Sequence, residues 1–296
     1  MIENDSLTCP VCGHELNKTG RQFHCENNHQ FDVAKQGYVN LLQPQHKKSK
    51  QPGDSAEMVE ARFRFLDEGY YQPISDKLNE LVGKHYLTKS DQPYRITDAG
   101  SGEGYYTQRL HQYLQERIHV PSHDDLQGND LQVMGFDISQ RAVKASCRRS
   151  KSIQWITATS SHIPVADKSQ NVVLSLFSRI VPEEFSRILK KDGILYVAST
   201  GPQHLIELRN TLYQDVKQQA YNPTPTLSGA FTPLERELSA NIHYTTDINS
   251  HQAINDLLLM TPHYWRAKES AKVTLQALET LTVTVDIMLT GYRLSS

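Results

Sequence analysis

The chain has 296 residues, of which 38% are hydrophobic and 22% charged, so it can form a packed core and is not intrinsically disordered. Its 31 basic and 33 acidic residues give a net charge of −2, which argues against a protein that holds nucleic acid by bulk positive charge. No apolar run approaches the roughly 18–20 residues of a membrane span, and the polar N-terminus has no signal core, so we expect a cytoplasmic protein without a membrane partner.

The N-terminal segment carries a metal-binding pattern. Cys9 and Cys12 form a C-x2-C pair, and Cys25 and His29 follow with spacings of twelve and three residues. Zinc prefers four such ligands in a tetrahedron. Residues 1–30 contain few large apolar side chains, so bound metal would have to supply the folding free energy of this segment. Because the protein provides all four ligands, we expect a structural zinc site.

Other interpretations of the cysteines remain open. They could be a redox pair or scattered thiols, although a turn follows the C-x2-C pair where a thioredoxin-like unit has a helix. His14 and His24 are alternative ligands, but His24 directly precedes Cys25 and is badly placed for the same tetrahedron. Cys147 stands alone on an expected helix, where we interpret it as a small buried apolar residue.

A basic stretch without acids follows between residues 34 and 53. It is either a solvated linker or an arm that contacts phosphates. Asp54 or Ser55 can then cap a helix, and a second helix is expected near residues 74–82. The basic residues of the stretch are Lys35, Lys47, Lys48 and Lys50.

A glycine-rich turn joins a short strand at residues 94–98 to a helix that ends near residue 114. The strand ends in Asp98, and Gly100, Gly102 and Gly104 follow. Glycines permit a tight turn and close approach of a ligand, and a helix N-terminus offers free backbone amides. The pattern differs from the dinucleotide fingerprint and from the P-loop. The turn is therefore expected to bind a small ligand, but by neither of these two motifs.

The following segments alternate strands with helices. A strand at 131–136 ends in Asp137, an acid placed to hold ribose hydroxyls, and further strands are expected at 153–157, 171–177 and 194–198. Alternation of this kind predicts an α/β fold with a doubly wound parallel sheet. Every motif then lies at the carboxyl ends of strands, where such folds bind ligands.

Other segments carry weaker signals. Residues 119–130 read as a polar loop insertion, and the basic helix at 141–151 is interpreted as an exposed face. The segment 190–193 predicts a turn. The run at 281–293 predicts a strand that could complete the sheet with an antiparallel edge. The aromatic-basic cluster at 260–266 either stacks on a base or packs on the core.

The D-x-G-x-G turn, Asp137 and the Lys-Lys-Asp-Gly segment at 190–193 resemble class I methyltransferases that use S-adenosylmethionine. Further motifs, in the same order over nearly the whole chain, resemble one family, the bacterial 23S rRNA (guanine-N1) methyltransferases of the RlmA type. Residues 177–179 depart from it, since they read Phe-Ser-Arg where aromatic-Ala-Pro is usual. The matching motifs are the Cys3His cluster and residues 29–32, 37–42, 52–58, 102–107, 160–162, 201–205 and 260–268.

The resemblance implies a Rossmann-like α/β methyltransferase fold, with a doubly wound, mostly parallel seven-stranded sheet and a small N-terminal zinc-binding module. We expect the zinc module at residues 1–36, a basic linker with helices at 37–90 and the methyltransferase domain at 91–296. One structural Zn²⁺ would be held by Cys9, Cys12, Cys25 and His29. S-adenosylmethionine would be bound by Tyr71, Asp98, Gly100, Gly102, Glu103, Asp137 and His204.

The implied reaction is transfer of a methyl group from S-adenosylmethionine to N1 of a guanine in 23S ribosomal RNA, with the zinc module helping RNA recognition. Two alternatives are a small-molecule methyltransferase and a non-catalytic adapter that binds RNA through its zinc module. The sequence identifies neither the guanine nor the group that removes its N1 proton, so the catalytic residues are unknown. It also does not decide between a monomer and a homodimer.

Overall fold

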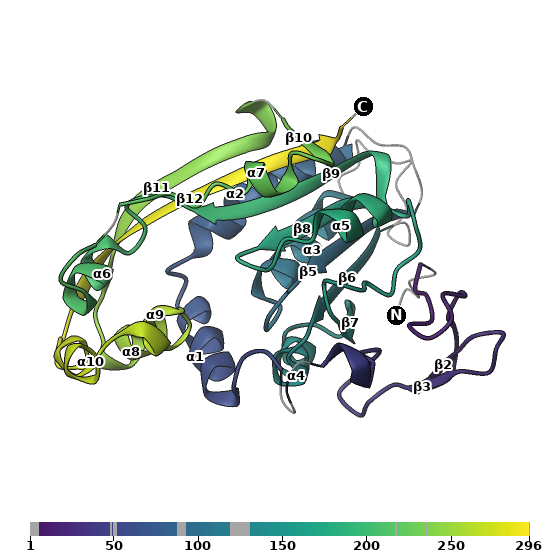
Figure 1. Cartoon of the computed structure of the whole chain (residues 1–296), viewed down its shortest axis with the longest axis horizontal. Coiled ribbons are helices and arrows are strands. Elements are labelled where there is room, and N and C mark those ends of the chain that lie inside the picture. Colours follow the sequence, from purple (N-terminus) through teal and green to yellow (C-terminus); the bar gives the residue numbers. More distant parts are fainter. Residues whose placement is uncertain are drawn as a thin grey trace.

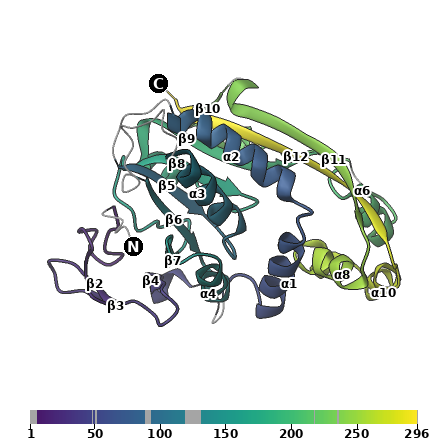
Figure 2. The same ribbon diagram turned by 180° about the vertical axis from the view of Figure 1, so that it is seen from behind.

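The computed structural model describes residues 6–47, 49, 52–87, 93–118, 131–216, 218–234 and 236–295. A large central sheet carries helices on both of its faces, which confirms the doubly wound α/β architecture (Figure 1 and Figure 2). A small N-terminal sheet lies beside it. The polar insertion expected at 119–130 lies outside the described residues.

The central sheet has nine strands, in the order β10-β12-β9-β8-β5-β6-β7-β4, with β11 paired to β12. The five contacts from β4 to β9 are parallel, whereas β12 is antiparallel to β9, β10 and β11. Seven strands thus form the expected mostly parallel sheet, and β4 and β10 extend it. The bounds are β4 Val39–Asn40, β5 Tyr94–Ala99, β6 Leu131–Asp137, β7 Gln154–Thr157, β8 Gln170–Leu176, β9 Leu189–Thr200, β10 Phe231–Pro233, β11 Ser239–Ile248 and β12 Leu281–Leu294.

Two sequence expectations need correction. The C-terminal run is antiparallel, but β12 lies inside the sheet and not at its edge, since Ile287 pairs with Thr200 of β9 and with Ile242 of β11. Its side chains are mostly buried, whereas only two of the ten residues of β11 are buried, so β11 is the outer strand. The turn expected at 190–193 falls within β9, where the pairing with β8 shifts register and these residues bulge from the ladder.

Helices cover the sheet and extend past its carboxyl edge. Ser55, one of the two expected caps, begins the first helix, because its Oγ accepts a hydrogen bond from Met58 N at 3.2 Å. In the described part of the chain, none of the helices combines the length and apolar character that crossing a bilayer requires. The α-helices are α1 Ala56–Asp67, α2 Gln72–Leu87, α3 Tyr105–Ile118, α4 Gln140–Arg149, α5 Pro182–Ile188, α6 Ile206–Leu212, α7 Thr224–Leu227, α8 His251–Leu259, α9 His263–Arg266 and α10 Glu269–Gln276.

Helices α1 and α8 pack together beyond the sheet edge (Figure 1). The Arg64 guanidinium of α1 donates two hydrogen bonds, of 2.9 and 2.6 Å, to the carboxylate of Asp256 on α8. Asp256 is buried, so this bidentate pair is shielded from solvent on one side. Residues far apart in the sequence therefore close one side of the space above the parallel strands.

The N-terminal module shares its core with the large sheet. Its three antiparallel strands, β1 Asn17–Thr19, β2 Gln22–His24 and β3 Gln30–Asp32, are short. Its apolar side chains belong to the same buried cluster as residues of β6, β7, β8 and α5, so the module gains apolar packing that its own sequence lacks. These side chains are Leu7, Leu16 and Phe23.

Candidate functional site

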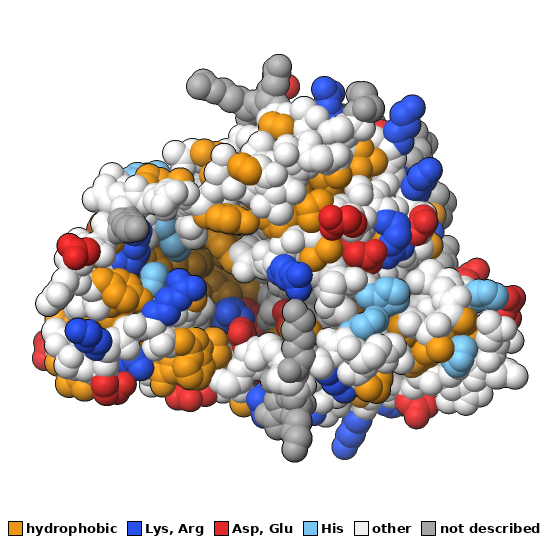
Figure 3. Space-filling view, in the orientation of Figure 1, with side chains coloured by type: hydrophobic (Ala, Val, Ile, Leu, Met, Phe, Trp, Pro, Cys, Tyr) orange, Lys and Arg blue, Asp and Glu red, His pale blue; other side chains and the backbone are white. Residues whose placement is uncertain are grey.

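A cavity of about 1160 Å³ opens at the carboxyl ends of the parallel strands β5, β6, β8 and β9. Figure 3 shows it as a deep recess with hydrophobic walls, and Lys and Arg side chains lie beside its opening. All seven residues that the sequence predicted for the methyl donor line this cavity. They are Tyr71, Asp98, Gly100, Gly102, Glu103, Asp137 and His204.

The glycine-rich turn forms the floor between β5 and α3. Gly100, Gly102 and Gly104 have φ values of +84°, +56° and +87°, in the left-handed region that favours glycine. A Cβ on Gly100 or Gly104 would lie within 2.7 Å of a neighbouring side chain, so these two positions allow tight packing. In the part of the chain that the structure describes, a Cβ on Gly102 would meet only the Arg62 guanidinium beyond its chain neighbours, at 3.6 Å. Gly102 therefore leaves its backbone open to the cavity.

Two carboxylates flank this turn, the buried Asp98 and the half-buried Asp137. Thr107 Oγ1 donates a 2.6 Å hydrogen bond to Asp98 Oδ2, whereas Asp98 Oδ1 has no partner, and burial raises the pKa of Asp98 to about 7. Ser139 N donates to one oxygen of Asp137 at 2.7 Å, and Gly102 N donates to the other at 3.1 Å. Burial also raises the pKa of Asp137. Each carboxylate thus keeps acceptor capacity for a ligand.

Tyr71 and His204 approach each other from outside the glycine turn, with ring centroids 6.2 Å apart. Burial lowers the pKa of His204 to about 4, so its imidazole is neutral near pH 7. Asp286 N donates to His204 Nδ1 at 3.4 Å, which leaves the proton of the neutral ring on Nε2. His204 can therefore donate a hydrogen bond from Nε2.

Glu103 lines the cavity, but its carboxylate forms a close ion pair with Arg149. The Arg149 guanidinium also donates to Asp67 Oδ1 at 2.6 Å and lies 3.9 Å from the centroid of the Phe63 ring. The sequence interpretation of this helix face as exposed is wrong for Arg149, whose side chain is only 7% exposed. The contact was missed because its partners come from α1 and the glycine turn, remote in sequence.

We expect Arg149→Met to destabilise the fold by about 3–5 kcal/mol, because it leaves the Glu103 carboxylate buried without a partner. Arg148→Met is the matched control. Arg148 is the preceding residue of α4 and pairs with Glu60, but both side chains are about half exposed, so its loss should cost only about 0–1 kcal/mol. Chemical denaturation of the two variants measures the difference, and equal free energies of unfolding would contradict the structural role of Arg149.

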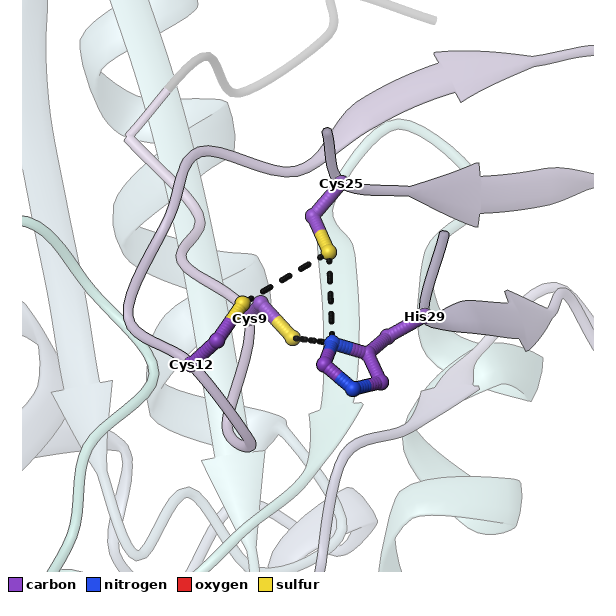
Figure 4. Close-up of side chains that lie close together, drawn as sticks. All are labelled: Cys9, Cys12, Cys25 and His29. Atoms are coloured by element: carbon purple, nitrogen blue, oxygen red, sulfur yellow. Dashed lines mark hydrogen bonds between the residues drawn. The ribbon is translucent and has the colours of Figure 1, made fainter. Parts of the chain in front are cut away.

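The four predicted metal ligands converge in the N-terminal module (Figure 4). Cys12 Sγ lies 3.6 Å from Cys25 Sγ, and His29 Nδ1 lies 3.6 Å from Cys9 Sγ and 3.4 Å from Cys25 Sγ. A zinc tetrahedron with ordinary Zn–S and Zn–N bonds has edges of about 3.5–3.8 Å. The donor set therefore fits Zn²⁺ in both chemistry and size.

The alternative ligands lie elsewhere. Among the described residues, the only group of His, Cys, Asp and Glu side chains that could hold a metal is the predicted set, without His14 and His24. His14 instead forms a close ion pair with Glu26. In the basic stretch, Lys35 and Lys47 are exposed, while Lys48 and Lys50 lie outside the described residues.

Two family models match the chain. One, described as RlmA, N-terminal, matches residues 7–50, and the other, described as methyltransferase domain, matches residues 70–231. The second covers more than half of the chain. The first contains the complete Cys3His cluster, and the second contains the glycine turn with Asp98 and Asp137.

Two named proteins are similar over most of their length. YxjB of Bacillus subtilis, whose name assigns it to the 23S rRNA (guanine-N(1)-)-methyltransferases, is 30% identical over 289 residues, 97% of this chain and 96% of that protein. The 23S rRNA (guanine(748)-N(1))-methyltransferase of Streptomyces fradiae is 30% identical over 259 residues, 88% of this chain and 85% of that protein. Among solved structures, BH2331 of Bacillus halodurans can be superimposed on 74% of this chain, and the match includes 98% of the BH2331 chain. The two chains are 13% identical, with a TM-score of 0.44.

Proposed function

The chain belongs to the 23S rRNA (guanine-N1) methyltransferases, and we propose that it transfers the methyl group of S-adenosylmethionine to N1 of a guanine in 23S ribosomal RNA. The observation that carries this proposal is similarity that spans 97% of the chain and includes both the zinc module and the sheet domain. An acceptor in the ribosome implies that the protein works in the cytoplasm.

Donor binding is assigned to the cavity at the carboxyl edge. Asp137 would accept hydrogen bonds from ribose hydroxyls, Gly102 lets the backbone approach the ligand, and Asp98 Oδ1 offers an unpartnered acceptor. Tyr71 and His204 would complete the pocket on the other side. This set fits the donor, because it combines an acid for the ribose, an open glycine backbone and a buried free carboxylate oxygen.

S-adenosylmethionine supplies a methyl group that its sulfonium already activates. The task of the protein is then to align the acceptor nitrogen with that methyl group and to exclude water, which is catalysis by positioning. The cavity, at about 1160 Å³, exceeds the roughly 300–1,000 Å³ typical of a pocket for one small ligand. It therefore has room for an acceptor base beside the donor.

The zinc ion has a structural role in this proposal, because Cys9, Cys12, Cys25 and His29 fill all four tetrahedral positions. The module is fixed against the large sheet through its shared core, so it presents a defined surface near the exposed Lys35 and Lys47. We assign this surface a part in RNA recognition.

Two alternatives are less well supported. A non-catalytic adapter has no use for a cavity lined by the complete set of predicted donor residues. A small-molecule methyltransferase does not account for similarity to the named relatives that extends through the zinc module.

Transfer of tritium from labelled donor to 23S rRNA that lacks the modification tests the proposal. We expect label in the RNA and, on mapping, a block to reverse transcription at one guanine, because N1 methylation removes a Watson–Crick donor. Labelled small molecules and unlabelled RNA would contradict the proposed acceptor.

The ionisation of Asp98 should make donor affinity depend on pH. Its pKa of about 7 means that the carboxylate is mostly protonated at pH 6 and mostly ionised at pH 8, and the ionised form favours a cationic donor. We expect binding to tighten by up to about tenfold between these pH values, measured by calorimetry. Asp98→Asn should remove the dependence, and the exposed Asp247→Asn should keep it. A dependence that survives in Asp98→Asn would assign it to another group.

A further inference from the structure

We propose that Phe177, Tyr221 and Trp265 form an aromatic clamp at the mouth of the cavity, and that this clamp stacks on an unpaired purine of the RNA acceptor. The inference rests on the proposed function and deepens it, because it assigns the place where the acceptor base is held. It concerns cavity residues that are not among the predicted donor residues.

The first observation is exposure. In the described part of the chain, six large hydrophobic side chains are exposed, and the three aromatic ones among them are Phe177 at 45%, Tyr221 at 52% and Trp265 at 69%. All three line the same cavity. Exposed aromatic side chains that gather around one opening are typical of a binding site, whereas exposed apolar residues scattered singly are ordinary.

The second observation is position. Phe177 directly follows β8, and Tyr221 is anchored at the end of β9, because its backbone N donates to Thr200 O at 3.0 Å. Trp265 lies on α9. In the sheet order β9-β8-β5-β6, the first two residues stand over β8 and β9, whereas Gly102 and Asp137 stand over β5 and β6. Phe177 and Tyr221 are therefore displaced along the carboxyl edge of the sheet from the ribose-binding part of the proposed donor site.

Trp265 is held in place although its ring is exposed. Its ring meets that of Tyr264 edge to face, with centroids 5.1 Å apart, and Lys272 Nζ of α10 lies 4.5 Å from the centroid of the Tyr264 ring. Fixed aromatic side chains bind with little loss of side-chain entropy. Tyr264 thus contacts the Trp265 ring, and most of that ring stays exposed and available to a ligand.

Phe177 has a backbone conformation that is unusual for a bulky side chain. Its φ of +56° is in the left-handed region, which is unfavourable for a residue with a Cβ. The next residue fixes this turn, because Ser178 Oγ donates to Ala99 O at 2.6 Å. The Phe177 ring lies 6.2 Å from that of Tyr106, another cavity residue. Backbone strain that is maintained in this way is frequent at binding sites.

Three arginines lie at or near one part of the cavity rim. Arg179 and Arg266 are exposed and Arg209 is half-buried, and all but Arg266 line the cavity directly. Arg266 lies near His263, which lines the cavity. Burial and the charges of Arg209 and Arg266 together lower the pKa of His263. On a chain with a net charge of −2, this local group of cations complements the phosphates on either side of an acceptor nucleotide.

The chemistry of the acceptor agrees with this arrangement. N1 of guanine takes part in Watson–Crick pairing, so the base must leave its pair before methylation, and proteins hold such bases by stacking on aromatic rings. Stacking depends on the π face and not on the N1 edge, which stays free to meet the methyl group. The clamp thus presents the reactive edge while it replaces the stacking that the base has lost.

The first test is single-turnover methylation of unmodified 23S rRNA by Trp265→Ala, Trp265→Phe and Val273→Ala. We expect Trp265→Ala to lower the rate at limiting RNA by about tenfold or more and Trp265→Phe to recover most of it, while donor affinity stays unchanged. Val273 on α10 is the matched control, because it is 58% exposed and does not line the cavity. A wild-type rate for Trp265→Ala would overturn the clamp.

The second test uses intrinsic fluorescence. The chain has two tryptophans, and Trp155 is 1% exposed, so acrylamide should quench mainly Trp265. A purine-containing single-stranded oligoribonucleotide should shield Trp265 from acrylamide, and an absence of shielding at saturating oligoribonucleotide would contradict stacking on this ring. If Trp265 became shielded from acrylamide as the protein concentration rises, in the absence of RNA, the exposed rings would be a self-association surface, and the clamp would be overturned. Normal donor binding with no RNA methylation by the unmodified chain would instead overturn the proposed function.

Discussion

Gly102→Arg should abolish donor binding, with affinity reduced by more than about a hundredfold in calorimetry. Gly102 has a φ of +56°, a conformation that costs a residue with a Cβ about 1–2 kcal/mol. Among the described residues other than its chain neighbours, Nη1 of Arg62 is the nearest heavy atom to a Cβ at this position, at 3.6 Å, so a long side chain would extend into the cavity. It would fill the space beside Asp137 and bring a positive charge towards a cationic donor.

Two controls separate a blocked cavity from a damaged fold. Gly102→Ala adds only a Cβ with ordinary contacts, so it should weaken binding modestly through the backbone cost. Gly229→Arg should bind the donor normally, because Gly229 is exposed, lacks the left-handed conformation and has no atom within 4 Å of an added Cβ. A folded Gly102→Arg variant with unchanged affinity would place the donor site elsewhere.

The sequence predicted the residues around the cavity because their positions follow from topology. Asp98 is the penultimate residue of β5, Asp137 ends β6 and His204 follows β9, and the carboxyl ends of parallel strands meet at one edge of a sheet. Strand assignment alone therefore brings these loops together. Their roles towards the donor remain predictions, which the Gly102 and Asp98 variants test.

Features that depend on contacts between distant segments were not predictable in this way. Strands β4 and β10 have only two and three residues, too few to show a periodic pattern. The burial of Arg149 depends on acids of α1 and the glycine turn. For the aromatic-basic cluster at 260–266, the sequence did not decide between stacking on a base and packing on the core. In the structure the two aromatic residues differ, since Tyr264 packs against the core while Trp265 is 69% exposed.

Cys25→Ser should reduce bound zinc from about one ion per chain to nearly none and unfold the N-terminal module. Zinc binding contributes about 10–16 kcal/mol to the folding of small zinc modules, and Cys25 Sγ contacts two of the other ligand atoms. Metal analysis of the purified protein and limited proteolysis within residues 6–36 measure the two effects. His24→Ala is the matched control, because His24 is the adjacent residue and lies outside the metal cluster.

The same substitution should also lower the thermal stability of the sheet domain. Leu7, Leu16 and Phe23 belong to its core, and each buried side chain of this size contributes about 1.5–3 kcal/mol. Donor affinity should nevertheless persist, because none of the described residues of the module, 6–36, lines the cavity. Loss of zinc with unchanged melting of the sheet domain would show that the shared core is dispensable, and retained zinc would show that another ligand replaces Cys25.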